Sequence, residues 1–143
     1  ILVGTGARLR VQPDFLNLLA NLQEVNLLNM AYYSGTSPSV IMEGEKDFAL
    51  TPPLVRYGDF LGCDRFDITG KVETINVPAQ ILVGVHDKLT PVRYSEYLRD
   101  HLPQASLEII PEAGHMVMIE QPFEVNMAIQ TFLHTLSGCS MQL

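Results

Sequence analysis

Short apolar runs alternate with helical repeats in the second half of the chain. Residues 79–85 have the length and apolar content of a buried strand, and residues 105–110 are expected to form a second strand. The segments 91–101 and 122–138 repeat apolar residues at helical spacing, and each begins with a proline, which suits the first turn of a helix. Strand, helix, strand, helix at these lengths predicts a βαβα unit with parallel strands and a right-handed crossover.

The first half of the chain has a different pattern. Ile1–Val3 is an apolar run that we expect to end a buried parallel strand, and a loop follows at Gly4–Gly6. Helical spacing then predicts three helices, near residues 13–32, 40–51 and 54–61. A break in the first of them is expected near Asn21. No strand is predicted between residues 8 and 65.

These patterns divide the chain into three parts. Residues 1–7 are expected to end a core strand, and residues 8–72 are expected to form a mostly helical part. Residues 73–143 are expected to form the C-terminal βαβα part of the core. The chain opens inside an apolar strand without an initiator methionine, so we expect its true N-terminus to lie upstream.

Composition and charge exclude several classes of protein. An apolar fraction of 47% and a charged fraction of 17% are typical of a folded globular chain. The net charge of −7 disfavours nucleic acid and anionic membranes as partners. No apolar run reaches the roughly 18 residues that span a bilayer. These values do not define a substrate.

The cysteines and glycines predict no metal and no cofactor. Cys63 and Cys139 lack C-x-x-C spacing, so neither a disulfide framework nor a zinc site is expected. Free thiols fit a cytoplasmic location. Gly4-Thr5-Gly6 lacks both the later Gly-Lys-Ser/Thr of a phosphate loop and the third glycine of a dinucleotide fingerprint.

Two residues with complementary acid–base chemistry follow the two predicted strands of the second half. Asp87 comes just after residues 79–85, and His115 comes a short loop after residues 105–110. Ligands bind outside the carboxyl ends of parallel strands, and neighbouring strands lie roughly 5 Å apart, so we expect the two side chains to meet. A histidine can carry a proton to and from a substrate while a carboxylate orients its ring.

Structural roles for these residues are the alternative. Asp87 can cap the helix that begins near Pro91, and an isolated histidine is commonly structural. We favour a catalytic pair because both residues occur together, and we assign no role to His86. Glu120 is expected to stabilise the start of the last helix through the helix dipole and loop hydrogen bonds.

Two loops resemble those of the α/β-hydrolases. Residues 84–91, Gly-Val-His-Asp-Lys-Leu-Thr-Pro, resemble the acid loop of that family. Residues 113–122, Ala-Gly-His-Met-Val-Met-Ile-Glu-Gln-Pro, resemble its histidine loop, and residues 2–7 resemble the strand after the nucleophile strand. The resemblance implies an α/β fold, namely the C-terminal part of an α/β-hydrolase parallel sheet with a helical lid insertion.

The resemblance also implies roles for the pair. The chain order in that family is nucleophile, acid, histidine, which makes Asp87 the acid and His115 the general base. The Gly-x-Ser-x-Gly elbow that carries the family's nucleophile does not occur in this sequence. Ser34, Ser37 and Ser39 lie in a loop of the lid-like segment and not at a strand-to-helix turn. The nucleophile and the oxyanion-hole donors are therefore expected upstream of this chain.

In such hydrolases the lid covers the active site and shapes the substrate pocket. The expected pocket residues are Leu27, Met30, Tyr33, Met42, Phe60 and Leu61 of the lid, with Met116 and Val117 beside the histidine. The lid-like segment is rich in Leu and Met and poor in Arg and Lys, so we expect a small, largely apolar substrate.

The function favoured by the sequence is that of a serine hydrolase acting on an ester or related acyl bond. Related reactions remain open: those with an aspartate nucleophile (dehalogenase, epoxide hydrolase), and carbon–carbon or peptide cleavage. The alternative is a truncated, non-catalytic fragment that pairs its open sheet edge with the missing N-terminal part or with a second copy as a homodimer. A third reading is a small-molecule receptor or scaffold built on the same fold.

Overall fold

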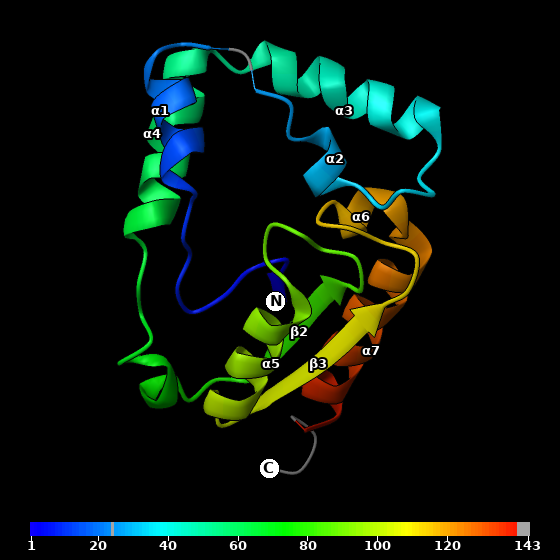
Figure 1. Cartoon of the computed structure of the whole chain (residues 1–143). Coiled ribbons are helices and arrows are strands. Elements are labelled where there is room, and N and C mark those ends of the chain that lie inside the picture. The colour runs from blue at the N-terminus through cyan, green and yellow to red at the C-terminus, as the bar shows by residue number, and fades with distance from the viewer. Residues whose placement is uncertain (24, 140–143) are drawn as a thin grey trace.

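A three-stranded parallel sheet, in the order β1-β2-β3, organises the chain (Figure 1). Its strands are β1 (Leu2–Val3), β2 (Ala79–Gly84) and β3 (Ala105–Ile110). The computed structural model describes residues 1–23 and 25–139, so the sequence predictions for residues 140–143 lie outside it. The α/β class and the parallel pairing expected from the sequence are confirmed.

Seven α-helices and one 3₁₀ helix accompany the sheet in the described residues. They are α1 (Pro13–Ala20), α2 (Leu28–Ala31), α3 (Pro38–Leu50), α4 (Pro53–Arg65), η1 (Val72–Thr74), α5 (Val92–His101), α6 (Val117–Glu120) and α7 (Pro122–Cys139). The break expected near Asn21 is present: α1 ends at Ala20, and α2 begins at Leu28. Between them Leu22 takes a φ of 55°, outside the right-handed helical region. The helix predicted at residues 54–61 extends to Arg65.

β2 is the centre of the core, and all of its residues are buried. Since side chains alternate along a strand, Ile81 packs in a cluster with Leu98 of α5, while Leu82 packs in a second cluster with Val125 and Ala128 of α7. Helices α5 and α7 therefore cover opposite faces of the sheet (Figure 1).

The carboxyl ends of β2 and β3 hold two loops tightly together. Gly84 pairs with Ile110 at the end of the ladder, and the main-chain N–H groups of Val85 and His86 continue the pairing with bonds of 2.9 Å each. A Cβ on Gly84 would lie 2.2 Å from the carbonyl oxygen of Gly114. Only glycine allows this approach, which sets the loop after β2 against the loop after β3.

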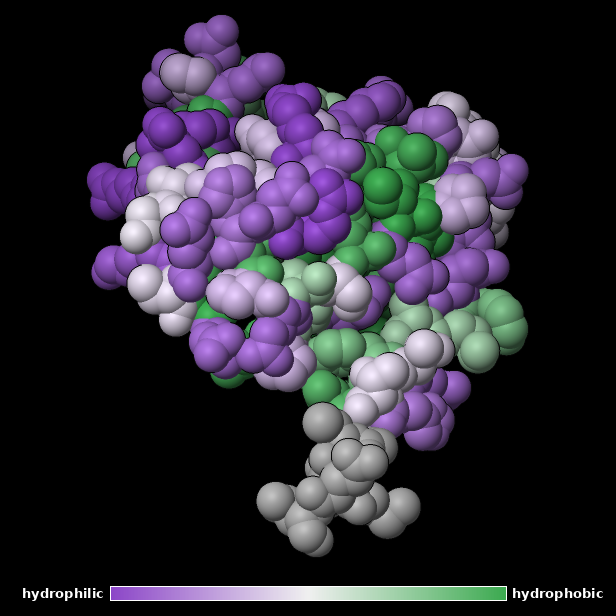
Figure 2. Space-filling view, turned by 90° about the horizontal axis from the view of Figure 1, so that it is seen from below, coloured by the Kyte–Doolittle hydropathy of each residue, from purple (hydrophilic) through white to green (hydrophobic). Residues whose placement is uncertain are grey.

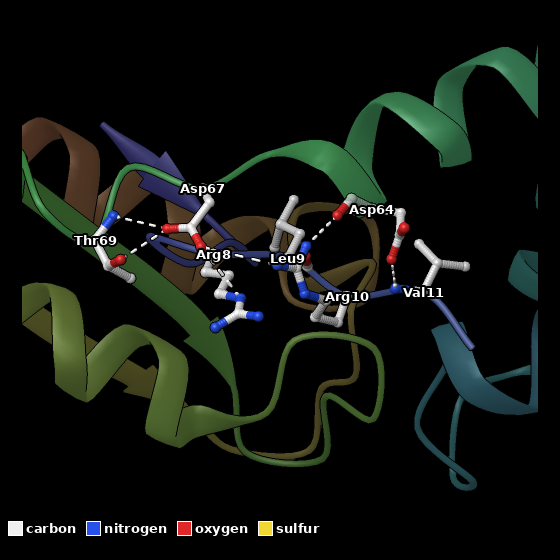
Figure 3. A network of polar contacts seen from close by, with 7 residues as sticks. All are labelled: Arg8, Leu9, Arg10, Val11, Asp64, Asp67 and Thr69. Carbon is white, nitrogen blue, oxygen red and sulfur yellow. Dashed lines mark hydrogen bonds and ion pairs between the residues drawn. The ribbon is translucent and has the colours of Figure 1, made fainter. Parts of the chain in front are cut away.

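The helices α1–α4 are here called the helical segment. Two stretches of main chain that lie side by side connect this segment to the sheet (Figure 3). We call this crossing, residues 7–11 with residues 64–69, the neck. Arg8 and Asp67 form an antiparallel bridge there, and Nε of Arg8 lies 3.2 Å from Oδ2 of Asp67. The main-chain N–H of Val11 donates to a carboxylate oxygen of Asp64 at 3.1 Å. The two ends of the helical segment are thus tied at one place.

The surface mixes hydrophilic and hydrophobic residues, and in Figure 2 the hydrophobic ones gather between hydrophilic areas of the face shown. Several large apolar side chains are exposed, including those of Phe123, Val77 and Met127. Within residues 1–23 and 25–139, no helix combines the length and the hydropathy that crossing a membrane requires. The same residues hold no group of three His, Cys, Asp or Glu side chains that could bind a metal ion.

Candidate active site

The structure brings Asp87 and His115 into direct contact. Nδ1 of His115 lies 2.9 Å from Oδ2 of Asp87. Asp87 lies in the loop after β2, and His115 lies in the loop after β3, so adjacent parallel strands present both residues at the same edge of the sheet.

The carboxylate of Asp87 is held rigidly by its own loop. The main-chain N–H groups of Leu89 and Thr90 donate to Oδ1 at 2.9 Å and 2.8 Å. The hydroxyl of Thr90 donates to Oδ2 at 2.8 Å, and the side chain is fully buried. Asp87 therefore closes its own turn, whereas the N-cap position of α5 belongs to Pro91.

Burial and hydrogen bonding act in opposite directions on Asp87. Burial raises the pKa of the carboxyl, but the hydrogen bond and positive charge of His115 and the hydrogen bonds from Thr90 lower it further, so the net pKa lies below its ordinary value. The group is thus a carboxylate at neutral pH. As an acceptor it favours the histidine tautomer that carries its proton on Nδ1, which leaves Nε2 free to accept one.

His115 is positioned from the helical segment as well as from the sheet. Its main-chain N–H donates to the carbonyl oxygen of Ala31 at 2.7 Å, and the N–H of Met116 shares this acceptor at 3.1 Å. Nε2 has no hydrogen-bond partner among the residues that the structure describes. Because 28% of the side chain is exposed, this nitrogen can exchange a proton with a bound molecule.

Glu120 links the histidine loop to the helical segment. One carboxylate oxygen accepts from the N–H of Gly114 at 2.8 Å, and the other accepts from the N–H of Tyr33 at 2.7 Å and from the hydroxyl of Thr36. The loop bonds expected of Glu120 are therefore present. Their reach to Tyr33 and Thr36 was missed, because 87 residues separate Tyr33 from Glu120 in the sequence.

Gly4, at the end of β1, closes the pair from a third side. Its φ is +51°, and a Cβ there would lie 3.2 Å from Nδ1 of His115 and 3.4 Å from Oδ2 of Asp87. From the sequence, Gly4 was expected only to begin a loop. Its position directly after a β-branched strand residue was the signal that could have placed it at the site.

Two cavities meet at His115. The first, which we call the neck cavity, has a volume of about 400 Å³ and is lined in part by Gly4, Arg10, Phe15, Lys88, Arg93 and Tyr94. The second, which we call the α3 cavity, has a volume of about 770 Å³ and is lined in part by Tyr32, Glu45, Asp47, Phe48, Arg56 and Met116. Leu27, Phe60, Leu89 and His115 line both. These volumes suit small organic molecules.

The residues expected to line the substrate pocket divide into two groups. Leu27, Met30, Phe60 and Met116 line at least one of the two cavities. The other four, Tyr33, Met42, Leu61 and Val117, are not among the residues that line either cavity. The ring of Tyr33 stacks on His86 with centroids 4.4 Å apart, Met42 is 52% exposed, and Val117 is fully buried in the α7 cluster.

The basic side chains of the neck cavity were missed by the sequence analysis. Lys88 and Arg93 come from the loop before α5 and from its first turn, outside the segment whose Arg and Lys content was considered. Their positions next to the predicted acid were the signal that could have included them.

Known proteins are similar to this chain in sequence and in structure. A solved thermophilic esterase superposes on 93% of the chain with a TM-score of 0.78 and 36% sequence identity. Protein ABHD8 of Homo sapiens is 39% identical over 59 residues, and 3-oxoadipate enol-lactonase 2 of Acinetobacter baylyi (strain ATCC 33305 / BD413 / ADP1) is 28% identical over 67 residues. No family model matches the chain.

The chain spans only part of each of these proteins. It covers 54% of the esterase chain, and the matched segments cover 13% of ABHD8 and 25% of the enol-lactonase. In this chain those segments account for 41% and 47% of the residues.

Proposed function

This chain belongs to the α/β-hydrolase superfamily, and we propose that it supplies the acid and the general base of a serine-type hydrolase that acts on an ester or related acyl bond. The observation that carries the proposal is the 2.9 Å contact between Asp87 and His115, with Nε2 of the histidine directed to no described protein group. The similarity to an esterase and to an enol-lactonase supports acyl-bond hydrolysis as the reaction class.

The proposed chemistry follows from this geometry. Nε2 of His115 takes the proton of a serine hydroxyl as that oxygen attacks the substrate carbonyl carbon, and Asp87 stabilises the imidazolium. His115 then gives the proton to the leaving alcohol, which departs as an acyl-serine forms. Water attacks the acyl group, His115 again accepts and returns a proton, and the acid product leaves.

The nucleophile is proposed to lie in a segment that precedes this chain. Thr90 is the hydroxyl bonded nearest to the pair, but it contacts Nδ1 at 3.3 Å and donates to Asp87, so it supports the acid. No described serine lines either cavity. The 143 residues alone are therefore expected to be inactive, and the helical segment is proposed to act as the lid over the completed site.

Pairing of the open sheet edge is the second candidate function. β1 pairs with β2 on one side, and in the described sheet it is an outer strand. Its other side is available to the preceding part of the same protein or to a second copy of the chain.

The test measures hydrolysis of p-nitrophenyl esters by the 143-residue chain and by the longer protein that the proposal requires. We expect turnover only by the longer protein, and its loss in His115→Ala. The exposed His134 provides the control, because His134→Ala should keep full activity. His115-dependent turnover by the chain alone would contradict the position given to the nucleophile. The second candidate would be favoured if the longer protein hydrolysed no ester and if analytical ultracentrifugation showed that the chain associates through the free edge of β1.

A further inference from the structure

Basic side chains gather at the neck cavity although the chain is acidic. The net charge is −7, yet four of the nine lysine and arginine residues line the neck cavity or the one beside it. The four are Arg8, Arg10, Lys88 and Arg93. No Asp or Glu is among the described residues lining these two cavities, whereas Glu45 and Asp47 line the α3 cavity. The charge around His115 thus differs between its two sides.

Two of these cations are already committed to the neck. Arg8 lies 3.2 Å and Arg10 3.8 Å from Oδ2 of Asp67, and Arg10 also donates to the main-chain carbonyl of Asp64 (Figure 3). The positive charges of Arg8 and Arg10 are therefore partly compensated by a carboxylate of the chain itself.

Arg93 is in a different position. Its guanidinium lies over the ring of Tyr94, 5.2 Å from the centroid, and it has no carboxylate within ion-pair distance among the described residues. Arg93 and Tyr94 line both the neck cavity and the adjoining cavity of about 390 Å³. Nζ of Lys88 donates to the carbonyl oxygen of Asn29 at 3.2 Å, which leaves its other protons available.

We propose that the neck cavity binds a carboxylate group of the substrate, with Arg93 as its principal contact and Lys88 as a second cation. A planar guanidinium donates two parallel hydrogen bonds to a carboxylate, which gives both attraction and orientation. The reacting carbonyl would then lie at His115 and the carboxylate at the opposite end of the same cavity. This inference rests on the proposed function, and it replaces the largely apolar substrate expected from the sequence with an acyl compound that bears a distal carboxylate.

Direct binding tests the proposal without turnover. Titration calorimetry compares monomethyl glutarate with its uncharged dimethyl ester on the 143-residue chain, on Arg93→Gln and on Arg99→Gln. Arg99 is the matched control because it lies on the same helix and is paired with Asp100 at 2.8 Å. We expect the chain and Arg99→Gln to prefer the monoanion, and Arg93→Gln to bind it about tenfold more weakly, the effect of one charge-assisted hydrogen bond or more.

Equal binding of the two esters by the unaltered chain, or unaltered binding of the monoanion by Arg93→Gln, would overturn the carboxylate site. Arg93→Lys keeps the positive charge but removes the planar guanidinium with its two parallel donors. We expect its affinity for the monoanion to lie between that of Arg93→Gln and that of the unaltered chain. His115→Ala separates this inference from the proposed function. The His115→Ala chain should still bind the monoanion, because the proposed contacts come from Arg93 and Lys88. In the longer protein, loss of ester hydrolysis in His115→Ala supports the proposed function, and retained hydrolysis contradicts that function without contradicting the carboxylate site.

Discussion

Gly4 lies against His115 at the edge of the sheet, so close that a single added methyl group would sit 3.2 Å from the ring nitrogen that faces Asp87. Gly4 also takes a φ of +51°, and its N–H donates to the carbonyl oxygen of Leu82 at 2.9 Å. The end of β1 is therefore a wall of the site and not only a neighbour of β2.

Gly4→Ala should destabilise the chain and displace the histidine. We expect a loss of about 1–2 kcal/mol in the free energy of unfolding from the left-handed backbone alone, measured by urea denaturation. Gly70→Ala is the control, because a Cβ at Gly70 would meet no atom within 4 Å. Equal stability of the two variants would contradict the backbone strain expected at Gly4.

Asp87→Asn should leave the fold intact and remove most of the activity of the longer protein. The amide can donate to Nδ1 and so favours the wrong histidine tautomer, and it no longer stabilises the imidazolium. We expect kcat to fall by about 10³–10⁴-fold in steady-state ester hydrolysis. Near-normal rates would mean that Asp87 only shapes its loop. Thr90→Val, which removes one donor to Asp87, should cause a smaller loss.

The lowered pKa of Asp87 predicts a specific dependence of stability on pH. A carboxyl whose pKa is lower in the folded than in the unfolded state contributes stability above its unfolded pKa, and this contribution is lost as the pH falls through the folded pKa. The unfolded reference is 3.8, so the loss should occur below about pH 4. Denaturation curves at a series of pH values should show a shallower acid decline for Asp87→Asn. Parallel declines would contradict the shift.

Glu120→Gln should loosen the histidine loop. The amide keeps one acceptor for the three donors from Gly114, Tyr33 and Thr36, and we expect a loss of about 1–3 kcal/mol. Hydrogen exchange at the amides of Gly114 and Tyr33 should accelerate, while the amides of β2 stay protected. Glu124→Gln, at an exposed position in the first turn of α7, is the matched control. Unchanged hydrogen exchange at Gly114 would show that contacts other than those of Glu120 hold the histidine loop.

The sequence was sufficient where structure depends on local periodicity. β3 has the bounds that its apolar run predicted, and β2 ends one residue before its predicted end. The meeting of Asp87 and His115 follows from parallel pairing, because two strand ends at one edge bring their loops together.

Other features required three dimensions. The link from Glu120 to Tyr33 joins residues 87 positions apart, and no periodicity encodes such a contact. Whether an arginine forms an ion pair depends on which carboxylates the fold brings near it. Arg8 pairs with Asp67 across the neck, whereas the fold brings no described carboxylate to Arg93. The composition of the helical segment gives the number of its charged residues. It does not show which charged side chains line a cavity.

The neck also has an evolutionary consequence. A segment that leaves and returns to a scaffold at one tied crossing can be exchanged or resized while the scaffold keeps its geometry, as in tolerated domain insertions. Here the exchange is constrained, because the carbonyl oxygen of Ala31 holds the main chain of His115, and Tyr33 and Thr36 donate to Glu120. Descendants of such a gene can therefore vary the rest of the helical segment, provided that these few groups return to the same places.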